Sequence, residues 1–123
     1  DGWYSGTRAG WGGSGFGLQF EGGDTTWRAV VRGGGTLSTA NTGANIAAGY
    51  FLGLAYRDGA DLRYVIYTSA SDATFSGVTP TVGSTTPTSW PSATTLQALI
   101  YGEPGSAWTG TLAVAWAAAG TMR

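Results

Sequence analysis

The sequence predicts an all-β fold, an antiparallel two-sheet β-sandwich or jelly roll, on three observations. Short runs of alternating residues recur along the 123 residues, glycine- and proline-containing turns separate them, and no convincing helical period appears. The length suits one core and is too small for two. We therefore expect residues 1–123 to form a single domain that begins with a glycine-rich segment over residues 1–15.

The clearest element is a hairpin over residues 48–68, AGYFLGLAYRDGADLRYVIYT. Asp58 and Gly59 separate two apolar runs, and an Asp-Gly pair favours a primed two-residue turn with positive φ at both central positions. By parity, one face carries Tyr50, Leu52, Leu54 and Tyr56, and a face of the return strand carries Leu62, Tyr64, Ile66 and Thr68. The opposite parity is not polar enough for water alone, so we expect both faces to be covered.

The remaining elements follow from alternation and from turn residues. Strands are predicted at residues 15–21, 26–32, 36–39, 79–83, 95–102 and 108–118, a turn at 22–24 and a loop at 41–47. The strand at 79–83 is expected at a sheet edge, because it contains Pro80 and lies in a long Thr/Ser/Pro connection. The last segment, WTGTLAVAWAA, is ambiguous since alanine favours helix, but alternation of large and small residues favours strand.

Composition excludes several functions. The chain has no Cys, no His and no Lys, and the net charge is −1. Thiolate metal sites, disulfides and the commonest general base are therefore absent. The six arginines form no basic stripe, so nucleic acid is not an expected partner. No apolar run is long enough to span a membrane, and we expect a mature product or a domain of a longer chain.

The second half of the sequence resembles a known family. The run YFLGLAYRDGADLRYVIYTS, the Thr/Ser/Pro connection, LQALIYG and AWTGTLAVAWAAAG look like a concanavalin A-like (laminin G-like) jelly roll. Trp108, Gly110 and Leu112 occupy its closing W-x-G-x-L pattern. The version with YTS and a Thr-rich loop is similar to modules of bacteriophage virion and tail proteins. Family members usually carry one or two more strands before the region that matches Phe16.

Catalytic chemistry has little support. Glycosidases of this superfamily use paired carboxylates on one strand, whereas the only glutamates here, Glu21 and Glu103, are far apart. Serine nucleophiles lack a base. The aspartates at positions 24, 58 and 61 lie in turns, where Asp normally accepts bonds from its own backbone. The sequence thus predicts that the chain is not an enzyme.

Two kinds of binding site remain. Calcium, the only cofactor considered, would use Asp58, Asp61 and Asp72, with Asn41 and Asn45 as carbonyl donors. For carbohydrate, the loop aromatic residues Trp3, Tyr4, Trp11 and Trp90 could stack on a pyranose. The alternative for these four is to cover a sheet edge or a subunit contact. By parity, Trp27, Trp108 and Trp116 are expected in the core.

The leading hypothesis is a non-catalytic, lectin-like adhesion or decoration module that contacts a glycan or a cell-surface polymer. The resemblance and the weakly charged Thr/Ser/Gly composition place it on a virion surface or outside the cell. The rival is a structural protein that docks onto a capsid or tail lattice, as one of several assembly subunits or as a homo-oligomer. A glycoside hydrolase that uses Glu21 or Glu103 is the third hypothesis.

Overall fold

The computed structural model describes residues 14–46 and 49–92. All of them belong to the first of two units of the chain, Asp1–Ser92, and the second unit is Ala93–Arg123. The strands predicted at 95–102 and 108–118, including Trp108, Gly110, Leu112 and Trp116, lie outside the described residues. The expectation of a single domain remains a prediction.

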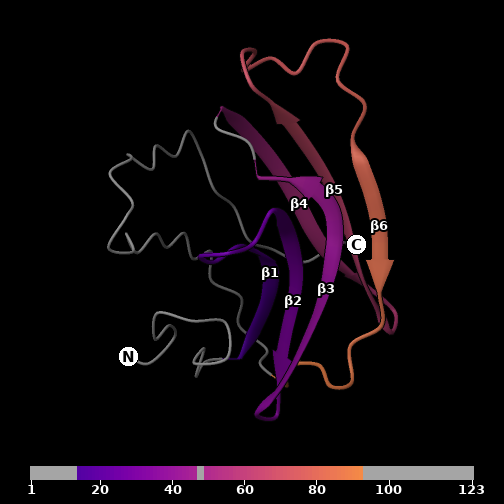
Figure 1. Cartoon of the computed structure of the whole chain (residues 1–123). Coiled ribbons are helices and arrows are strands. Elements are labelled where there is room, and N and C mark those ends of the chain that lie inside the picture. Colours follow the sequence, from indigo (N-terminus) through magenta and orange to yellow (C-terminus); the bar gives the residue numbers. More distant parts are fainter. Residues whose placement is uncertain (1–13, 47–48, 93–123) are drawn as a thin grey trace. The chain divides into compact units, whose positions relative to one another are not determined.

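Six strands make up the regular structure, in two antiparallel sheets of three strands each (Figure 1). The first sheet has the order β1 (Gly15–Gln19), β2 (Thr26–Gly33) and β3 (Thr36–Asn45). The second has the order β4 (Tyr50–Asp58), β5 (Asp61–Ser69) and β6 (Thr81–Thr85). The described part contains no helix, and hence none that could cross a membrane. The predicted all-β class with antiparallel pairing is confirmed.

The two sheets share one hydrophobic core. Its buried side chains are Ala29, Val31 and Ala44 from the first sheet and Leu62, Tyr64 and Ile66 from the second. Trp27 packs against this core as predicted, and its ring stacks on Phe51 of β4 with 3.8 Å between ring centroids. Burial of alternate residues from both sheets against one another is consistent with a β-sandwich.

The predicted central hairpin is confirmed, but its turn lies one residue later than expected. Asp58 and Asp61 are cross-strand partners, so the central turn residues are Gly59 and Ala60. Gly59 has φ = 60°, whereas Phe75 is the only non-glycine residue of the described part with positive φ. Positive φ at the first central position alone is typical of a type II′ turn, which places glycine there. Asp58 therefore ends β4 rather than starting the turn.

The loop predicted at 41–47 is wrong over most of its length, because β3 continues to Asn45. The pairing of β2 with β3 shifts register between Thr26 and Arg28, and Gly43 adopts φ = 78° in the extra residues of β3. A bulge breaks the simple alternation. Thr42 and Ala44 are nevertheless buried, so this polar-looking stretch is part of the sheet.

After β6 the chain returns to the first sheet. The Thr88 backbone N–H donates to Ser38 Oγ of β3, at 3.0 Å. At Gly33, a Cβ atom would lie 2.3 Å from the carbonyl carbon of Trp90, so only glycine fits this approach. The predicted edge strand is confirmed as β6, two residues later than expected.

Candidate functional site

The outer face of the β4–β5–β6 sheet is the candidate site. It is defined by the side chains whose parity is opposite to that of the buried core residues. Register places them in three rows across the strands: Leu52 with Tyr67, then Leu54 with Val65 and Val82, then Tyr56 with Arg63 and Ser84. Tyr50 and Asp58 share this parity at the two ends of β4. The central row is therefore entirely aliphatic.

These side chains are accessible. The exposed fractions are 48% for Tyr50, 37% for Leu52, 55% for Leu54 and 67% for Val82. The expectation that both faces of the hairpin are covered is thus wrong for the described residues. Isolated exposed apolar side chains are common on protein surfaces, but a contiguous set on one sheet face indicates an interaction surface.

The inner side of β4 explains why its large residues face outward. Its middle inner positions are Gly53 and Ala55, and β5 supplies the bulky core residues opposite them. A Cβ atom at Gly53 would lie 2.6 Å from Leu18 Cδ1 of β1 and 2.4 Å from Phe51 Cζ. The space inside β4 is already filled. Leu52 and Leu54 consequently contribute apolar surface on a side where the core does not use it.

One ion pair lies at one end of the face. Arg63 Nε donates to Asp58 Oδ2 at 2.5 Å, and both side chains are about half exposed. A surface pair of this kind adds little to stability, on the order of 1 kcal/mol or less. Asp61, the cross-strand partner of Asp58, shares the parity of Arg63 and accepts a bond from the Thr86 hydroxyl, so each charged side chain of the face has a partner within the chain.

Aromatic residues lie at the opposite end. The Tyr67 ring is tilted against Phe75, with 6.0 Å between the ring centroids. Phe75 has φ = 55°, an unusual conformation for an aromatic residue, in the loop that follows β5. Asp72 braces this loop by accepting bonds from Thr74 and from the Ser76 N–H. The Thr74 hydroxyl is the main cause that lowers the pKa of Asp72 below its ordinary value.

Of the aromatic residues predicted to bind carbohydrate, only Trp90 falls within the described part. Trp3, Tyr4 and Trp11 lie outside it. Trp90 packs against the core, and its Nε1–H donates to the Ala60 carbonyl oxygen at 2.9 Å. The Arg57 guanidinium lies over the ring, 4.6 Å from its centroid, and the ring also meets Phe16 edge-on. These contacts are those of a residue that covers a sheet edge, the alternative considered from the sequence.

The three aspartates considered for calcium do not come together. Asp58 and Asp61 are partners at the hairpin turn, whereas Asp72 follows the far end of β5. Asp61 Oδ1 accepts a hydrogen bond from the Thr86 hydroxyl, and Asp58 pairs with Arg63. Within residues 14–46 and 49–92, no group of three Asp or Glu side chains could hold a metal ion.

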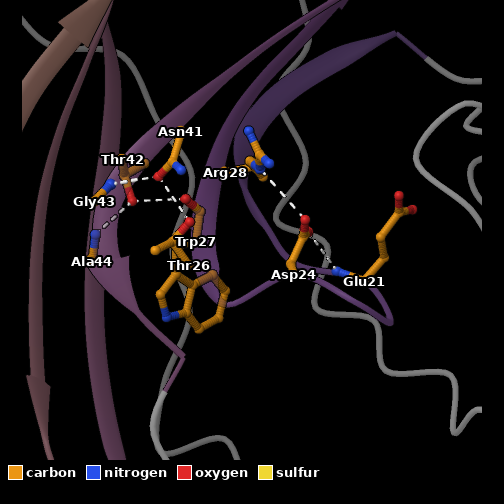
Figure 2. A network of polar contacts seen from close by, with 9 residues as sticks. All are labelled: Glu21, Asp24, Thr26, Trp27, Arg28, Asn41, Thr42, Gly43 and Ala44. Atoms are coloured by element: carbon orange, nitrogen blue, oxygen red, sulfur yellow. Dashed lines mark hydrogen bonds and ion pairs between the residues drawn. The ribbon is translucent and has the colours of Figure 1, made fainter.

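Asn41, considered as a carbonyl donor for calcium, is engaged in the β3 bulge (Figure 2). Its Oδ1 accepts bonds from the Thr26 hydroxyl and from the Gly43 N–H, both at 2.8 Å. The Thr42 hydroxyl donates to the Trp27 carbonyl oxygen and accepts from the Ala44 N–H. The network provides hydrogen-bond partners for backbone groups that the bulge leaves unpaired between β2 and β3.

A second polar group in Figure 2 joins Glu21 and Asp24 in the turn before β2. Asp24 Oδ2 accepts a bond from the Glu21 N–H, and the Asp24 N–H donates to the Glu21 carbonyl oxygen. Arg28 Nε lies 3.5 Å from Asp24 Oδ1, within ion-pair distance, but makes no hydrogen bond. These contacts close the turn before β2. Glu103, the partner in the hydrolase hypothesis, lies outside the described residues.

Alternation alone does not identify the outer face as a site, because only the pairing register shows which side of β4 faces the core. Alternation in β4 places Leu52 and Leu54 on one side, but only pairing with β5 shows that this side is opposite the core. The available clue was Gly53 and Ala55, since small residues on one parity of a strand indicate that neighbouring elements fill that side.

Comparison with known proteins identifies no relative. No family model matches the chain, and neither a curated protein nor a solved structure matches it. Function must therefore be argued from the chemistry of the described residues.

Proposed function

We propose that this chain is a non-catalytic binding module of a virion or of a secreted assembly, and that it docks onto a protein partner through the outer face of the β4–β5–β6 sheet. The observation that carries this proposal is the aliphatic row of Leu54, Val65 and Val82, whose two outer members are more than half exposed. Burial of such a row on a partner recovers hydrophobic free energy that folding leaves unused.

The composition of the face favours protein over sugar. Carbohydrate sites rely on aromatic faces that stack on the pyranose ring, together with polar groups that fix its hydroxyls. Here the centre is aliphatic, and the charged pair of Arg63 and Asp58 lies at one end. An apolar centre with a polar margin is the usual anatomy of a protein interface.

The engaged carboxylates support a non-catalytic role. Asp58 pairs with Arg63, Asp61 accepts a bond from Thr86, and Asp24 holds its turn. A general acid or base needs a carboxyl group within reach of a substrate rather than one committed to local structure. We further propose a jelly roll of the concanavalin A-like kind, supported by the closing pattern around Trp108 and Gly110 in the sequence.

Hydroxyl-radical footprinting tests the docking proposal. The free chain would be compared with the chain bound in the proposed assembly. We expect protection of Tyr50, Leu54 and Val82 in the assembly, and unchanged labelling of Phe20, which is 48% exposed outside the second sheet. Equal labelling of Leu54 in both states would contradict the proposal.

Lectin-like adhesion is the second candidate, supported by the aromatic end of the same face. Tyr50 is about half exposed, and Tyr67, one row away, contacts Phe75. A glycan array and sedimentation with insoluble cell-wall polysaccharide would test it. Binding that is lost in Tyr50→Ala and kept in Leu54→Ala would support adhesion, whereas absence of any glycan binding would leave protein docking alone.

A further inference from the structure

We propose that the partner of this outer face is a second copy of the chain, which forms a face-to-face dimer with two-fold symmetry. This inference rests on the proposed function, because it uses the same face. Most soluble homo-oligomers have closed symmetry, and a two-fold interface requires a surface that is complementary to itself. The rows of the β4–β5–β6 sheet meet this requirement in one orientation.

Charge selects the orientation. If the two-fold axis ran along β5, each row would face its own copy, and Arg63 would oppose Arg63 of the second molecule. Like charges placed directly opposite each other are unfavourable. If the axis runs along the central row, Leu54, Val65 and Val82 each face their own copies, whereas the Tyr67 row faces the Arg63 row. Arg63 then meets a tyrosine ring, a favourable cation–π arrangement.

The charged groups of the face are compatible with covering by a second copy. Asp58 already pairs with Arg63 within the chain, and Asp61 at the same end accepts a bond from the Thr86 hydroxyl, so the charged groups of the face do not need a partner's charges. Stacking two such faces keeps the Arg63–Asp58 ion pair and the Thr86–Asp61 hydrogen bond, which lowers the cost of covering these charged groups. Sheet-on-sheet packing is also the geometry in which two flat aliphatic faces interdigitate.

The size of the face predicts weak association. Three strands at about 4.8 Å spacing and three rows about 7 Å apart cover roughly 300 Å². A standard stable interface buries about 800 Å² per partner. The dimer should therefore form only at high concentration, and it should matter most where an assembly holds many copies close together.

Sedimentation equilibrium with charge-swapped variants at the two-fold axis tests the inference. Leu54→Glu and Leu54→Lys place like charges opposite each other in the dimer, so each variant alone should associate at least tenfold more weakly than the parent chain. An equimolar mixture should restore association, because glutamate then faces lysine. Thr39→Glu and Thr39→Lys, at an exposed position on β3, are the matched controls and should leave association unchanged.

Two results would overturn the dimer. The first is a parent chain that stays monomeric at every concentration up to the solubility limit. The second is association that the mixture of Leu54 variants fails to restore, which would exclude the two-fold arrangement. Neither result bears on protection of the same face in the native assembly, so failure of the dimer and failure of the docking function can be told apart.

Discussion

The central strands of the two sheets use their side chains differently. In β2, three consecutive residues, Ala29, Val30 and Val31, are buried, so both sides of that strand are covered. In β5, burial falls only on alternate residues, Leu62, Tyr64 and Ile66. Burial in β2 thus falls on both parities. The second sheet needs only one side, and its outer aliphatic row is available for binding.

The largest expected effect separates the two sides of the second sheet. Ile66→Ala removes a side chain that is 1% exposed and should lower the free energy of unfolding by about 2–5 kcal/mol. Leu54→Ala, on the outer side, should change it by roughly 0.5 kcal/mol or less. Urea denaturation of the two variants measures the difference. Equal losses would show that Leu54 belongs to the fold and would remove the basis of the docking proposal.

A smaller effect is expected where the chain returns to the first sheet. In Gly33→Ala, the new Cβ would meet backbone atoms of Trp90 and Pro91, which cannot move aside as a side chain can. Overpacking of this kind typically costs about 1–3 kcal/mol. Gly17→Ala is the matched control, because nothing lies within 4 Å of its Cβ position. If thermal unfolding shows equal stability for both variants, the close approach of Trp90 is incorrect.

Trp90 and Arg57 should show a modest coupling. Trp90→Phe removes the hydrogen bond to the Ala60 carbonyl and weakens the contact with the guanidinium, at a cost of about 1 kcal/mol. Arg57→Ala should cost less, since the side chain is exposed. A double-mutant cycle should give a coupling of about 0.5 kcal/mol. If the stability losses of the two variants simply add, the Trp90 ring and the Arg57 guanidinium do not interact energetically.

The smallest effect concerns the loop at the aromatic end of the face. Hydrogen bonds lower the pKa of Asp72 below its ordinary value of 3.8, so its ionised form stabilises the folded loop. That contribution is present above pH 3.8 and is lost as the pH falls through the lowered folded-state pKa. Melting temperatures of the parent chain and Asp72→Asn should therefore differ near neutral pH and converge in acid. A constant difference would exclude the carboxylate as the cause.

Strand positions could be predicted where local pattern and register agree. In the β4–β5 hairpin, alternation and a glycine turn gave both strands, although the turn centre moved to Gly59 and Ala60. In β3, the bulge at Gly43 breaks the period, and the hydrogen bonds of Asn41 and Thr42 are nonlocal. Local sequence pattern does not contain those partners, and it therefore predicts a loop where the strand continues.

The candidate site was harder to predict than the fold. The loop position of Trp90 suggested exposure, but the residues that engage it, Arg57, Ala60 and Phe16, come from distant parts of the chain. For the outer face the error is reversed, because apolar side chains there suggest burial although they are exposed. Its leucines resemble core residues until the register shows which side of β4 the core occupies.

The approach of Trp90 to Gly33 also has a kinetic consequence. The β4–β5 hairpin joins neighbouring residues, whereas the bond from Thr88 to Ser38 closes a separation of fifty residues. Contacts of such long range form late in folding, because loop closure has to precede them. Changes at this closure should therefore appear mainly as faster unfolding, with the refolding rate almost unaltered. We therefore expect the lifetime of the folded unit to depend on this closure rather than on the outer face of the second sheet.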